Sequence, residues 1–231
     1  MSTDLAKKLR EGTTKSHSMA ENVSFVKSFL GGVVDKKSYR KLLGNLFFIY
    51  SAIEEEIEIN KHHEVIKFIY YPQLYRRKSL MRDLEYYYGD NWLQLIKPSI
   101  ATQVYVDRIH KISYNSPELL IAHSYTRYIG DLSGGQILKK IAKSAMQLPD
   151  NLGSSFYDFE LIQDENMFKN QYRNSLNNIP LNQSQIDQII SEANIAFNLN
   201  MKIFQELNSN LFKIMLMLFM SSINTFRKKI S

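Results

Sequence analysis

The sequence predicts an all-α protein with one domain. Its 231 residues include only 9 Gly and 5 Pro but 14 Tyr and 13 Phe, and so few turn residues favour long helices over strands joined by tight turns. The content of 44% hydrophobic and 23% charged residues is ordinary for a packed globular chain. No internal repeat, low-complexity segment or linker divides it. We therefore expect a single domain over residues 1–231, with its core at about residues 4–226.

Glycine marks the limits of the first elements. Apolar residues recur at helical spacing over residues 3–30, which predicts one helix or two, interrupted at Gly12. The Gly-Gly pair at residues 31–32 supplies a stop signal. Asp35 or Lys36 opens the next helix, which presents a broad apolar face.

Prolines divide the middle of the chain. Pro72 separates a short helix from a second one at about residues 74–88. A further helix is expected at about residues 100–113, and the side chain of Ser116 is then well suited to an N-cap position. With the proline that follows it, this N-cap predicts a long helix that reaches about Met146.

The predicted helix that ends near Met146 contains three glycines, Gly130, Gly134 and Gly135. Each costs a helix about 1 kcal/mol relative to alanine, so packing or function must compensate. Beyond a loop, helices are expected over residues 164–177 and, after a break at a proline, over residues 182–226.

The composition excludes several classes of function. The chain has no cysteine, which rules out disulfide scaffolds, thiolate zinc sites and cysteine nucleophiles. The HExxH, GxSxG, GxGxxG and P-loop patterns are absent, as are the Glu-x-x-His pairs of di-iron bundles. The formal net charge is +6, from 29 basic and 23 acidic residues. Because bases and acids are interspersed and no nucleic-acid-binding signature is present, we expect no nucleic-acid partner.

No segment predicts membrane insertion or export. The longest apolar run, residues 214–220, is far shorter than the ~20 residues that a spanning helix needs. The N-terminus has no apolar segment and mixes acids with bases, unlike a secretory signal or a transit peptide. We expect a soluble protein that acts where it is made and has no membrane partner.

Two features could carry chemistry. Glu21 follows His17 by four residues, so on a helix its carboxylate can fix the imidazole tautomer and make the other nitrogen a better metal ligand. A histidine near an acid is, however, more often structural or exposed. The motif GDLSGGQ at residues 130–136 would let a helix backbone lie against a flat ligand. Close helix packing explains such glycines equally well, so both interpretations stay open on these features alone.

Four segments give the sequence a specific resemblance. They are LREGTTKSHSMAENV at residues 9–23, YSAIEEEI at 50–57, AHSYTRYIGDLSGGQILKKIA at 122–142 and FKNQYRNSLN at 168–177. In this order and spacing they resemble haem oxygenase over about residues 4–226, and most closely the soluble, ferredoxin-dependent enzymes of cyanobacteria and red-algal plastids. The resemblance implies a single-domain helical bundle in which haem lies between a proximal helix and a distal helix kinked at its glycines.

The resemblance implies roles for the residues around the iron. His17 matches the proximal ligand, for which neutral imidazole is a suitable donor, and Glu21 matches the residue that supports it. Asp131 matches the distal carboxylate that organises water and delivers protons to dioxygen. The other members of the distal hydrogen-bond network match Tyr50, Arg127 and Asn200. The distal backbone that contacts the porphyrin face matches Gly130, Gly134 and Gly135.

The remaining matches lie at the rim and wall of the implied pocket. The haem propionates need cations or hydroxyl donors, and the matching residues are Arg10, Tyr125, Lys169 and Arg173. Phe197 and Phe204 match aromatic residues of the pocket wall, although an aromatic pair at that spacing is otherwise most often core. The other four histidines match no ligand position and are expected to be structural or exposed; they are His62, His63, His110 and His123.

The implied function is that of an oxidoreductase, haem oxygenase, which uses dioxygen to open haem b to biliverdin IXα, carbon monoxide and ferrous iron. Haem would be both substrate and cofactor, with its iron held through His17. Electrons would come from ferredoxin, a small acidic protein that a basic surface including Lys7, Lys8, Lys139 and Lys140 could attract. One alternative is a carrier or sensor of the same fold that binds haem without reacting, against which Asp131 argues. Another is a thiaminase-like relative that binds no haem, against which His17 and GDLSGGQ argue.

The resemblance also suggests where the protein acts. Biliverdin could feed phycobilin pigments for photosynthesis. Abundant Asn, Ile and Lys are typical of an AT-rich plastid genome. We expect the plastid, as a chloroplast stroma protein, if the gene is plastid-encoded, and otherwise the cyanobacterial cytoplasm; a phage origin would look similar.

Overall fold

The computed structural model describes residues 3–150 and 152–230, with side chains up to residue 207. Every regular element in this part of the chain is helical, which confirms the predicted all-α class. The α-helices are α1 (Leu5–Gly12), α2 (Thr14–Glu21), α3 (Ser24–Leu30), α4 (Lys36–Ile59), α5 (Arg77–Tyr88), α6 (Trp92–Leu95), α7 (Ile100–Asn115), α8 (Leu120–Ser124), α9 (Gly130–Met146), α10 (Glu165–Asn177) and α11 (Gln183–Ile230). Short 3-10 turns are η1 (Ile66–Phe68), η2 (Pro72–Leu74), η3 (Pro117–Leu119) and η5 (Ser155–Tyr157), and η4 (Tyr125–Ile129) is a π turn.

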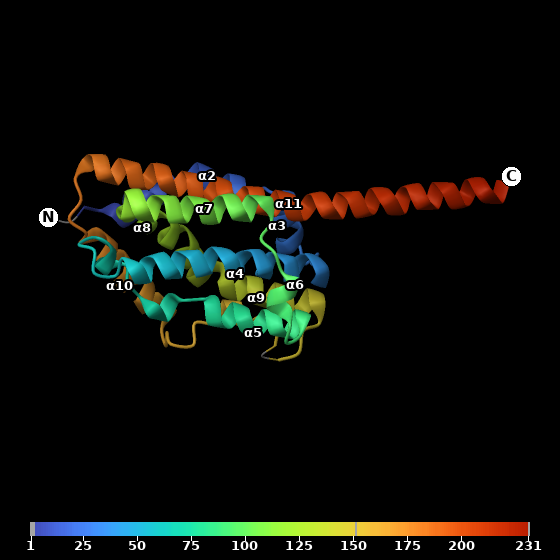
Figure 1. The fold of residues 1–231 in the computed structure, drawn as a ribbon, viewed down its shortest axis with the longest axis horizontal. Helices are drawn as coiled ribbons and strands as arrows, with labels where there is room; N and C mark the ends of the chain where they lie inside the picture. Colours follow the sequence, from blue (N-terminus) through green and yellow to red (C-terminus); the bar gives the residue numbers. More distant parts are fainter. Residues whose placement is uncertain (1–2, 151, 231) are drawn as a thin grey trace.

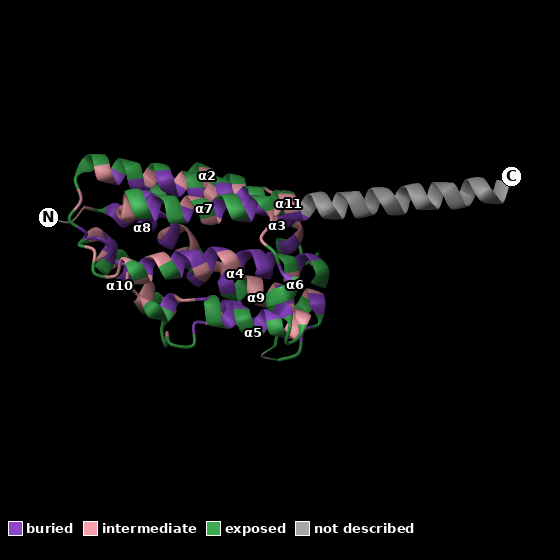
Figure 2. Cartoon of the chain, viewed as in Figure 1, coloured by how far each residue is buried: buried purple, intermediate pink, exposed green. Residues whose placement is uncertain are grey.

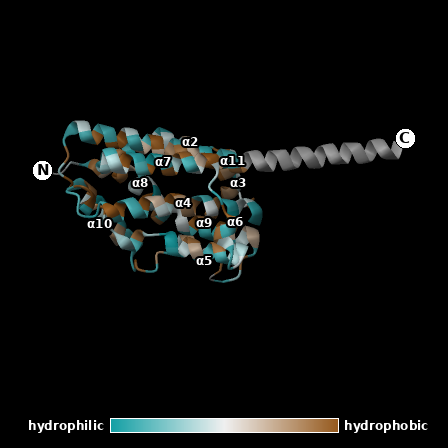
Figure 3. Ribbon diagram, in the orientation of Figure 1, coloured by the Kyte–Doolittle hydropathy of each residue, from teal (hydrophilic) through white to brown (hydrophobic). Residues whose placement is uncertain are grey.

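Helix α4 is the central element of the bundle. It packs against α5 on one side and α7 on the other, and α7 in turn packs against α11 (Figure 1). Helix α11 also contacts α1, α2, α3 and α8, so it joins the N-terminal helices to the rest of the bundle. Buried residues follow the inward faces of these helices (Figure 2), and the same faces are the hydrophobic ones (Figure 3).

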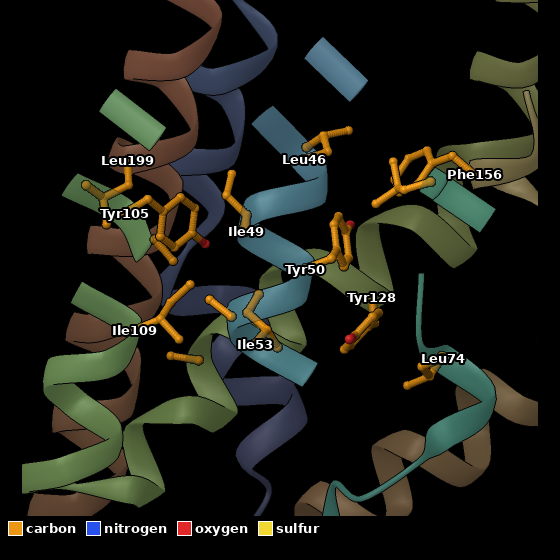
Figure 4. Close-up of a cluster of buried hydrophobic side chains, with 14 of the residues drawn as sticks. Leu46, Ile49, Tyr50, Ile53, Leu74, Tyr105, Ile109, Tyr128, Phe156 and Leu199 are labelled. Carbon is orange, nitrogen blue, oxygen red and sulfur yellow. The ribbon is translucent and has the colours of Figure 1, made fainter. Parts of the chain in front are cut away.

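The core is rich in aromatic side chains with hydroxyl groups. Tyr50 of α4 is fully buried between the cluster that contains Tyr105 of α7 and the cluster that contains Tyr128 of η4 (Figure 4). The Tyr50 and Tyr128 rings lie 5.7 Å apart between centroids. Each ring contributes a large apolar area to the core, but a buried hydroxyl needs a hydrogen-bond partner. The core therefore carries polar groups to the centre of the bundle.

Side-chain caps fix two helix boundaries that the sequence predicts. The carboxylate of Asp35 accepts a hydrogen bond from the Ser38 amide at 2.9 Å, and α4 begins at the next residue. Asp164 accepts from the amides of Asn166 and Met167 at 2.8 and 2.9 Å, ahead of α10. Such caps satisfy amides that have no partner within the helix.

Two predicted segments are more divided than expected. Residues 3–30 form three helices, not one or two. The predicted helix over residues 116–146 is a succession of η3, α8, η4 and α9. The predicted N-cap at Ser116 is wrong, because its side chain makes no cap hydrogen bond and a 3-10 turn follows it. Neighbouring elements hold these short pieces, since packing stabilises helices too short to persist alone.

No helix within the described residues is long and apolar enough to cross a bilayer. The apolar run at residues 214–220 lies outside the residues whose side chains are described.

Glu54 caps the start of α5 from the neighbouring helix α4, and this predicts how stability depends on pH. Its buried carboxylate accepts hydrogen bonds from the amides of Arg76 and Arg77. Burial raises the pKa of Glu54 to about 7, against the lowering effect of those amides. The folded chain therefore binds this proton more tightly than the unfolded chain, and ionisation costs stability as the pH rises from the unfolded pKa toward 7.

We expect Glu54→Gln to remove this cost. The melting temperature of the variant should rise relative to that of the original protein, by several degrees, between pH 5 and pH 7.5. Scanning calorimetry across that range measures the difference, with Glu85→Gln, at an exposed position of α5, as the control. Parallel melting curves for Glu54→Gln and the original protein would contradict the assignment.

Candidate functional site

A cavity of about 680 Å³ is formed by residues that are distant in sequence. Its size is typical of small-molecule and cofactor sites. Helices α1 and α2 supply part of its lining, and η4, α9, α10 and α11 supply the rest. The lining residues are Ala6, Arg10, Thr13, Thr14, His17, Tyr125, Thr126, Ile129, Gly130, Ser133, Arg173 and Phe197. Six of the predicted site residues are among them.

His17 of α2 presents its imidazole to this cavity. The side chain is 60% exposed, and Nδ1 faces Oε1 of Glu21 at 3.6 Å, one helical turn away. The edge of the Phe197 ring lies against the imidazole, with 5.7 Å between centroids and an interplanar angle of 73°. A carboxylate beside Nδ1 favours the tautomer in which Nε2 is free to act as a ligand. The arrangement suits an axial donor on an iron centre.

The glycines of α9 face different surroundings. A Cβ added at Gly130 or Gly134 would meet no atom within 4 Å. Protein packing therefore does not explain why these positions lack side chains, whereas a ligand lying on the helix would. Gly135 differs, because an added Cβ would lie 3.5 Å from the Tyr157 ring. Its side-chain-free surface packs against the protein and does not line the cavity.

An irregular turn precedes these glycines. Residues Tyr125–Ile129 form a π turn, and α9 is a regular helix from Gly130 onward. The irregularity thus lies one turn before the glycine motif, not at it. An extra residue in a helical turn rotates the following side chains around the axis, and such turns are frequent at functional sites. Here Arg127 and Asp131 are brought within 3.8 Å of each other, between Nη2 and Oδ1.

Arg127 is the centre of a buried hydrogen-bond network. Its Nε donates to the Tyr50 hydroxyl at 3.0 Å and its Nη1 donates to Oδ1 of Asn200 at 2.8 Å. The Tyr50 hydroxyl donates a short hydrogen bond to Oδ2 of Asp131. Asn200 is held in turn by donating from Nδ2 to the Ala196 carbonyl at 2.8 Å. The structure therefore brings together the four residues predicted for the distal network, from α4, η4, α9 and α11.

The network and burial act in opposite directions on the pKa of the Asp131 carboxyl. Burial raises the pKa of Asp131, while the Arg127 guanidinium and the Tyr50 hydroxyl act to lower it. Burial also raises the pKa of Tyr50 well above its usual value, so its hydroxyl stays protonated and remains a donor. A carboxyl with opposing influences of this kind is typical of groups that take part in proton transfer.

Cations and a phenol surround the rim of the cavity. Arg10 of α1 and Arg173 of α10 both line it, together with Tyr125 of η4. Burial raises the pKa of Tyr125, and both arginines oppose that effect because they lie close to its hydroxyl. Lys169 is one turn before Arg173 on α10 but does not line the cavity. Arg10, Tyr125 and Arg173 could together bind a ligand carboxylate.

Phe204 and Gly135, which were predicted to contact the ligand, pack against protein side chains instead. Phe204 of α11 stacks on Phe25 of α3, with 5.9 Å between centroids and an angle of 9°, and does not line the cavity. Gly135 packs against Tyr157, as described above. Conversely, no signal in the sequence points to Thr126, whose buried hydroxyl lines the cavity without a hydrogen-bond partner. Only its place within the π turn turns it toward the cavity.

Other predicted features have structural explanations. His123 is fully buried within the bundle, and His110 pairs its Nδ1 with Glu56 at 2.5 Å. Lys139, which was expected to contribute to a basic surface, is paired with Asp158 at 2.6 Å, so its charge is largely balanced. Within the described part of the chain, no three His, Cys, Asp or Glu side chains form a metal-binding group.

Comparison with known proteins shows the family of this chain. The family model described as heme oxygenase matches residues 3–206. This chain belongs to the haem oxygenase family. Among its relatives, the haem oxygenase of the red alga Porphyra purpurea is 62% identical over 229 residues, which cover 99% of this chain and 97% of the relative. Haem oxygenase 1 of the cyanobacterium Synechocystis is 59% identical over 213 residues, with 92% and 88% coverage.

Solved haem oxygenases share the fold. The crystal structure of haem oxygenase-1 from Synechocystis in complex with haem superimposes with a TM-score of 0.90 at 56% identity, covering 96% of this chain and all of that one. A haem oxygenase from Leptospira interrogans gives a TM-score of 0.84 at 48% identity, covering 89% of this chain and all of that one. The residues that line the cavity described above fit haem. It combines an imidazole, a helix face without side chains, cationic groups at the rim and a buried, unpaired hydroxyl.

Proposed function

We propose that this haem oxygenase opens haem b with dioxygen and ferredoxin-supplied electrons to biliverdin IXα, carbon monoxide and ferrous iron. The observation that carries the proposal is the position of Asp131. Its carboxyl is held by Tyr50 and Arg127 beside the glycines whose missing side chains leave open space. A carrier would need the imidazole and the cations, but it has no use for a proton-delivering carboxyl.

In this proposal His17 holds the haem iron, with Glu21 fixing the tautomer of its imidazole. Gly130 and Gly134 let the porphyrin face approach the backbone of α9, where a side chain would exclude it. Arg10, Tyr125 and Arg173 bind the propionates, joined by Lys169 if its flexible side chain turns toward the rim. These contacts with the propionates would set the orientation of the porphyrin ring in the cavity, and hence which of its edges faces the distal network.

When bound, haem supplies an iron centre that activates dioxygen for attack on its own macrocycle. The distal residues of the chain then control protons. Tyr50 donates to Asp131 and Arg127 lies beside both, so the carboxyl is oriented and its proton affinity is balanced. An ordered water between Asp131 and the ligand would relay the proton. Asp131 would thereby deliver its proton at one defined position beside the ligand.

The contacts of Phe197 and Phe204 support different roles for the two side chains. Phe197 lies against the imidazole of His17 and lines the cavity, so it can hold the proximal side of the macrocycle in place. Phe204 reaches the site only through Phe25 of α3. We assign Phe204 to support of the pocket wall.

Titration of the purified protein with hemin tests this function. A stoichiometric Soret band is expected, and addition of ascorbate in air should convert it into the absorption of biliverdin. A Soret band that persists under these conditions would favour the carrier or sensor. Chromatography of the extracted pigment against the four biliverdin isomers tests the α regiochemistry.

The proposed ferredoxin partner predicts a difference between reductants. Ferredoxins are acidic, and the chain carries a net charge of +6, with Lys7 and Lys140 exposed and Lys8 partly exposed. Salt screens attraction between exposed charges. Raising the salt concentration from about 20 to 300 mM should slow ferredoxin-supported turnover severalfold and leave ascorbate-supported turnover nearly unchanged. Equal slowing of both reactions would contradict this partner.

The relatives in red algae and cyanobacteria support a place in photosynthetic cells. We propose that the product feeds phycobilin synthesis and that the enzyme acts in a plastid stroma or a cyanobacterial cytoplasm. Identification of the gene on a plastid genome would test the first location.

A further inference from the structure

A second cavity, of about 590 Å³, lies at the end of the bundle where α6 is found (Figure 1). Its lining comes from α4, α5, α6, α7 and α11 and from the segment between α6 and α7, and it shares no lining residue with the haem cavity around His17. Its volume is close to the 680 Å³ of the haem cavity and is typical of small-molecule sites. Glu206 of this cavity and Phe197 of the haem cavity both lie on α11, about 14 Å apart along its axis.

Three cationic side chains line this second cavity. They are Arg40, Lys41 and Lys97, and none of them takes part in an ion pair among the described residues. The Arg40 guanidinium lies over the ring of Tyr88, 4.8 Å from its centroid, and Nε of Arg40 is buried without a hydrogen-bond partner. Because a buried donor without an acceptor costs free energy, Arg40 fits a site that an anion completes.

The polar acceptors in the lining are already engaged at the start of α7. Oδ1 of Asn45 accepts from the amide of Ser99 at 3.1 Å, and Oγ of Ser99 accepts from the amide of Thr102 at 3.3 Å. Oε1 of Glu206 accepts from the amide of Ala101 at 3.0 Å. Glu206 is the one acidic side chain of the lining within the described residues, so three cations face one carboxylate. An anionic ligand would balance this excess of positive charge.

Apolar side chains form the remaining wall of the second cavity. Leu95, Ile96, Ile100 and Leu207 all line it. Leu95 is 61% exposed and Ile100 is 82% exposed, so apolar surface lies open to solvent beside the cations. Exposed apolar surface of this kind is typical of a binding site. The haem cavity combines cations, a tyrosine and apolar residues in the same way. The ligand that fits the second cavity therefore has acidic groups on an apolar body.

Two differences from the haem cavity indicate a ligand without iron. No histidine lines the second cavity within the described residues, so it offers no imidazole as an axial donor. The glycine in its lining, Gly44, is packed against protein, because an added Cβ would lie 3.6 Å from Ile96. No open helix face is thus available to a flat macrocycle. Biliverdin keeps the two propionates and the pyrrole rings of haem but has neither the iron nor the closed ring.

We propose that the second cavity binds biliverdin after it leaves the haem cavity. Arg40, Lys41 and Lys97 bind the propionates, and the apolar wall covers part of the pyrrole rings. The proposal rests on the proposed function, in which biliverdin is the product, and extends that function with a place where the product is held outside the reacting site. The haem cavity can then accept the next haem while the product is still bound to the protein.

Titration of the ferric haem complex with biliverdin, without a reductant, tests the proposal. Haem then fills the first cavity, so added biliverdin can bind only elsewhere. We expect one equivalent to bind, measured by calorimetry and by circular dichroism induced in the red absorption of biliverdin, while the Soret band stays unchanged. Absence of binding would overturn the proposal. Loss of the Soret band during the titration would overturn it too, because biliverdin would then be displacing haem from the first cavity.

Substitutions in the lining locate the bound biliverdin. Arg40→Gln should raise the Kd for biliverdin about tenfold, since it removes a charged donor. Lys97→Glu and Ile100→Glu place a carboxylate at exposed positions, so they should fold normally and raise the Kd severalfold; they decide the test if Arg40→Gln does not fold. Lys111→Gln is the matched control, because this exposed lysine lies at the other end of α7. Equal affinity in all four variants would refute the proposed site.

Two competitors test the chemical class of the ligand. Inorganic phosphate in large excess should displace little biliverdin, because it cannot contact the apolar wall; full displacement would show a site for any anion, against the proposal. A second equivalent of hemin should bind more weakly than biliverdin, because the cavity offers no axial donor, and tighter binding of hemin would contradict the proposal.

The two proposals can fail separately. If bound haem gives no biliverdin with ascorbate in air, the proposed function fails, whereas the titration with added biliverdin still measures the second cavity. If biliverdin forms but the ferric haem complex binds none, only the second site is refuted.

Discussion

Replacing Asp131 by alanine is expected to leave haem bound while lowering biliverdin formation by at least about 100-fold, the usual cost of removing a proton-transfer group. The alanine variant loses both the acceptor for Tyr50 and the carboxyl that is proposed to direct protons. The cavity lining remains, because Asp131 is not part of it. Reducing equivalents should then support peroxidase-type oxidation by the variant. Oxidation of guaiacol measures this activity, and the Soret and biliverdin absorption are followed in the same samples.

Two further variants sharpen this test. Asp131→Asn still accepts a hydrogen bond from Tyr50 but cannot carry a proton, so it should resemble the alanine variant in turnover while keeping the network in place. Asp158→Asn is the control, because this carboxylate pairs with Lys139 of the same helix α9 at 2.6 Å and does not touch the cavity. Full biliverdin formation by Asp131→Asn would show that the carboxyl only positions its neighbours.

Replacing His17 by alanine is expected to lower turnover by roughly 100-fold, equivalent to ~2.7 kcal/mol. Among the described residues, His17 is the only histidine that lines the cavity. The substitution removes the proposed axial donor and the edge contact with Phe197. The space left should admit free imidazole. Added imidazole should therefore restore much of the activity and the original Soret position, which absorption spectroscopy follows during a titration.

The exposed His62 provides the control, since His62→Ala should behave like the original protein. The chain offers another comparison in Glu21→Gln, which keeps the ligand but weakens the partner of its Nδ1 atom. We expect a smaller loss of turnover for that variant. Wild-type haem spectra and turnover in His17→Ala would refute the assignment of the proximal ligand.

The helices were largely predictable because their signals are local. Asp35 and Asp164 cap the helices that follow them through bonds to amides two or three residues away. His17 and Glu21 face each other because four residues make one helical turn. The glycines at 130 and 134 stood out through their cost to a helix, and the structure shows open space beside them. Recognition of the family through motifs then placed these local features in one site.

Long-range contacts decided the features of the site that the sequence did not predict. The π turn at residues 125–129 has no local signal, because it is maintained by packing between η4 and the helices around it. It determines that Thr126 and Ile129 line the cavity while Arg127 turns to Tyr50 and Asn200, which are 77 and 73 residues away in sequence. Whether Phe204 and Gly135 meet ligand or protein was likewise decided by which side chains pack against them.

The sequence by itself determined the helical class, the main caps, the pairing of His17 with Glu21 and the family. Each depends on composition or on residues within about one helical turn or one motif. Only the tertiary structure decided the buried hydrogen bonds that join Arg127 to Tyr50 and Asn200. The reason is physical: a hydrogen bond between helices depends on where the bundle places each donor and acceptor, and burial makes an unpaired polar group costly.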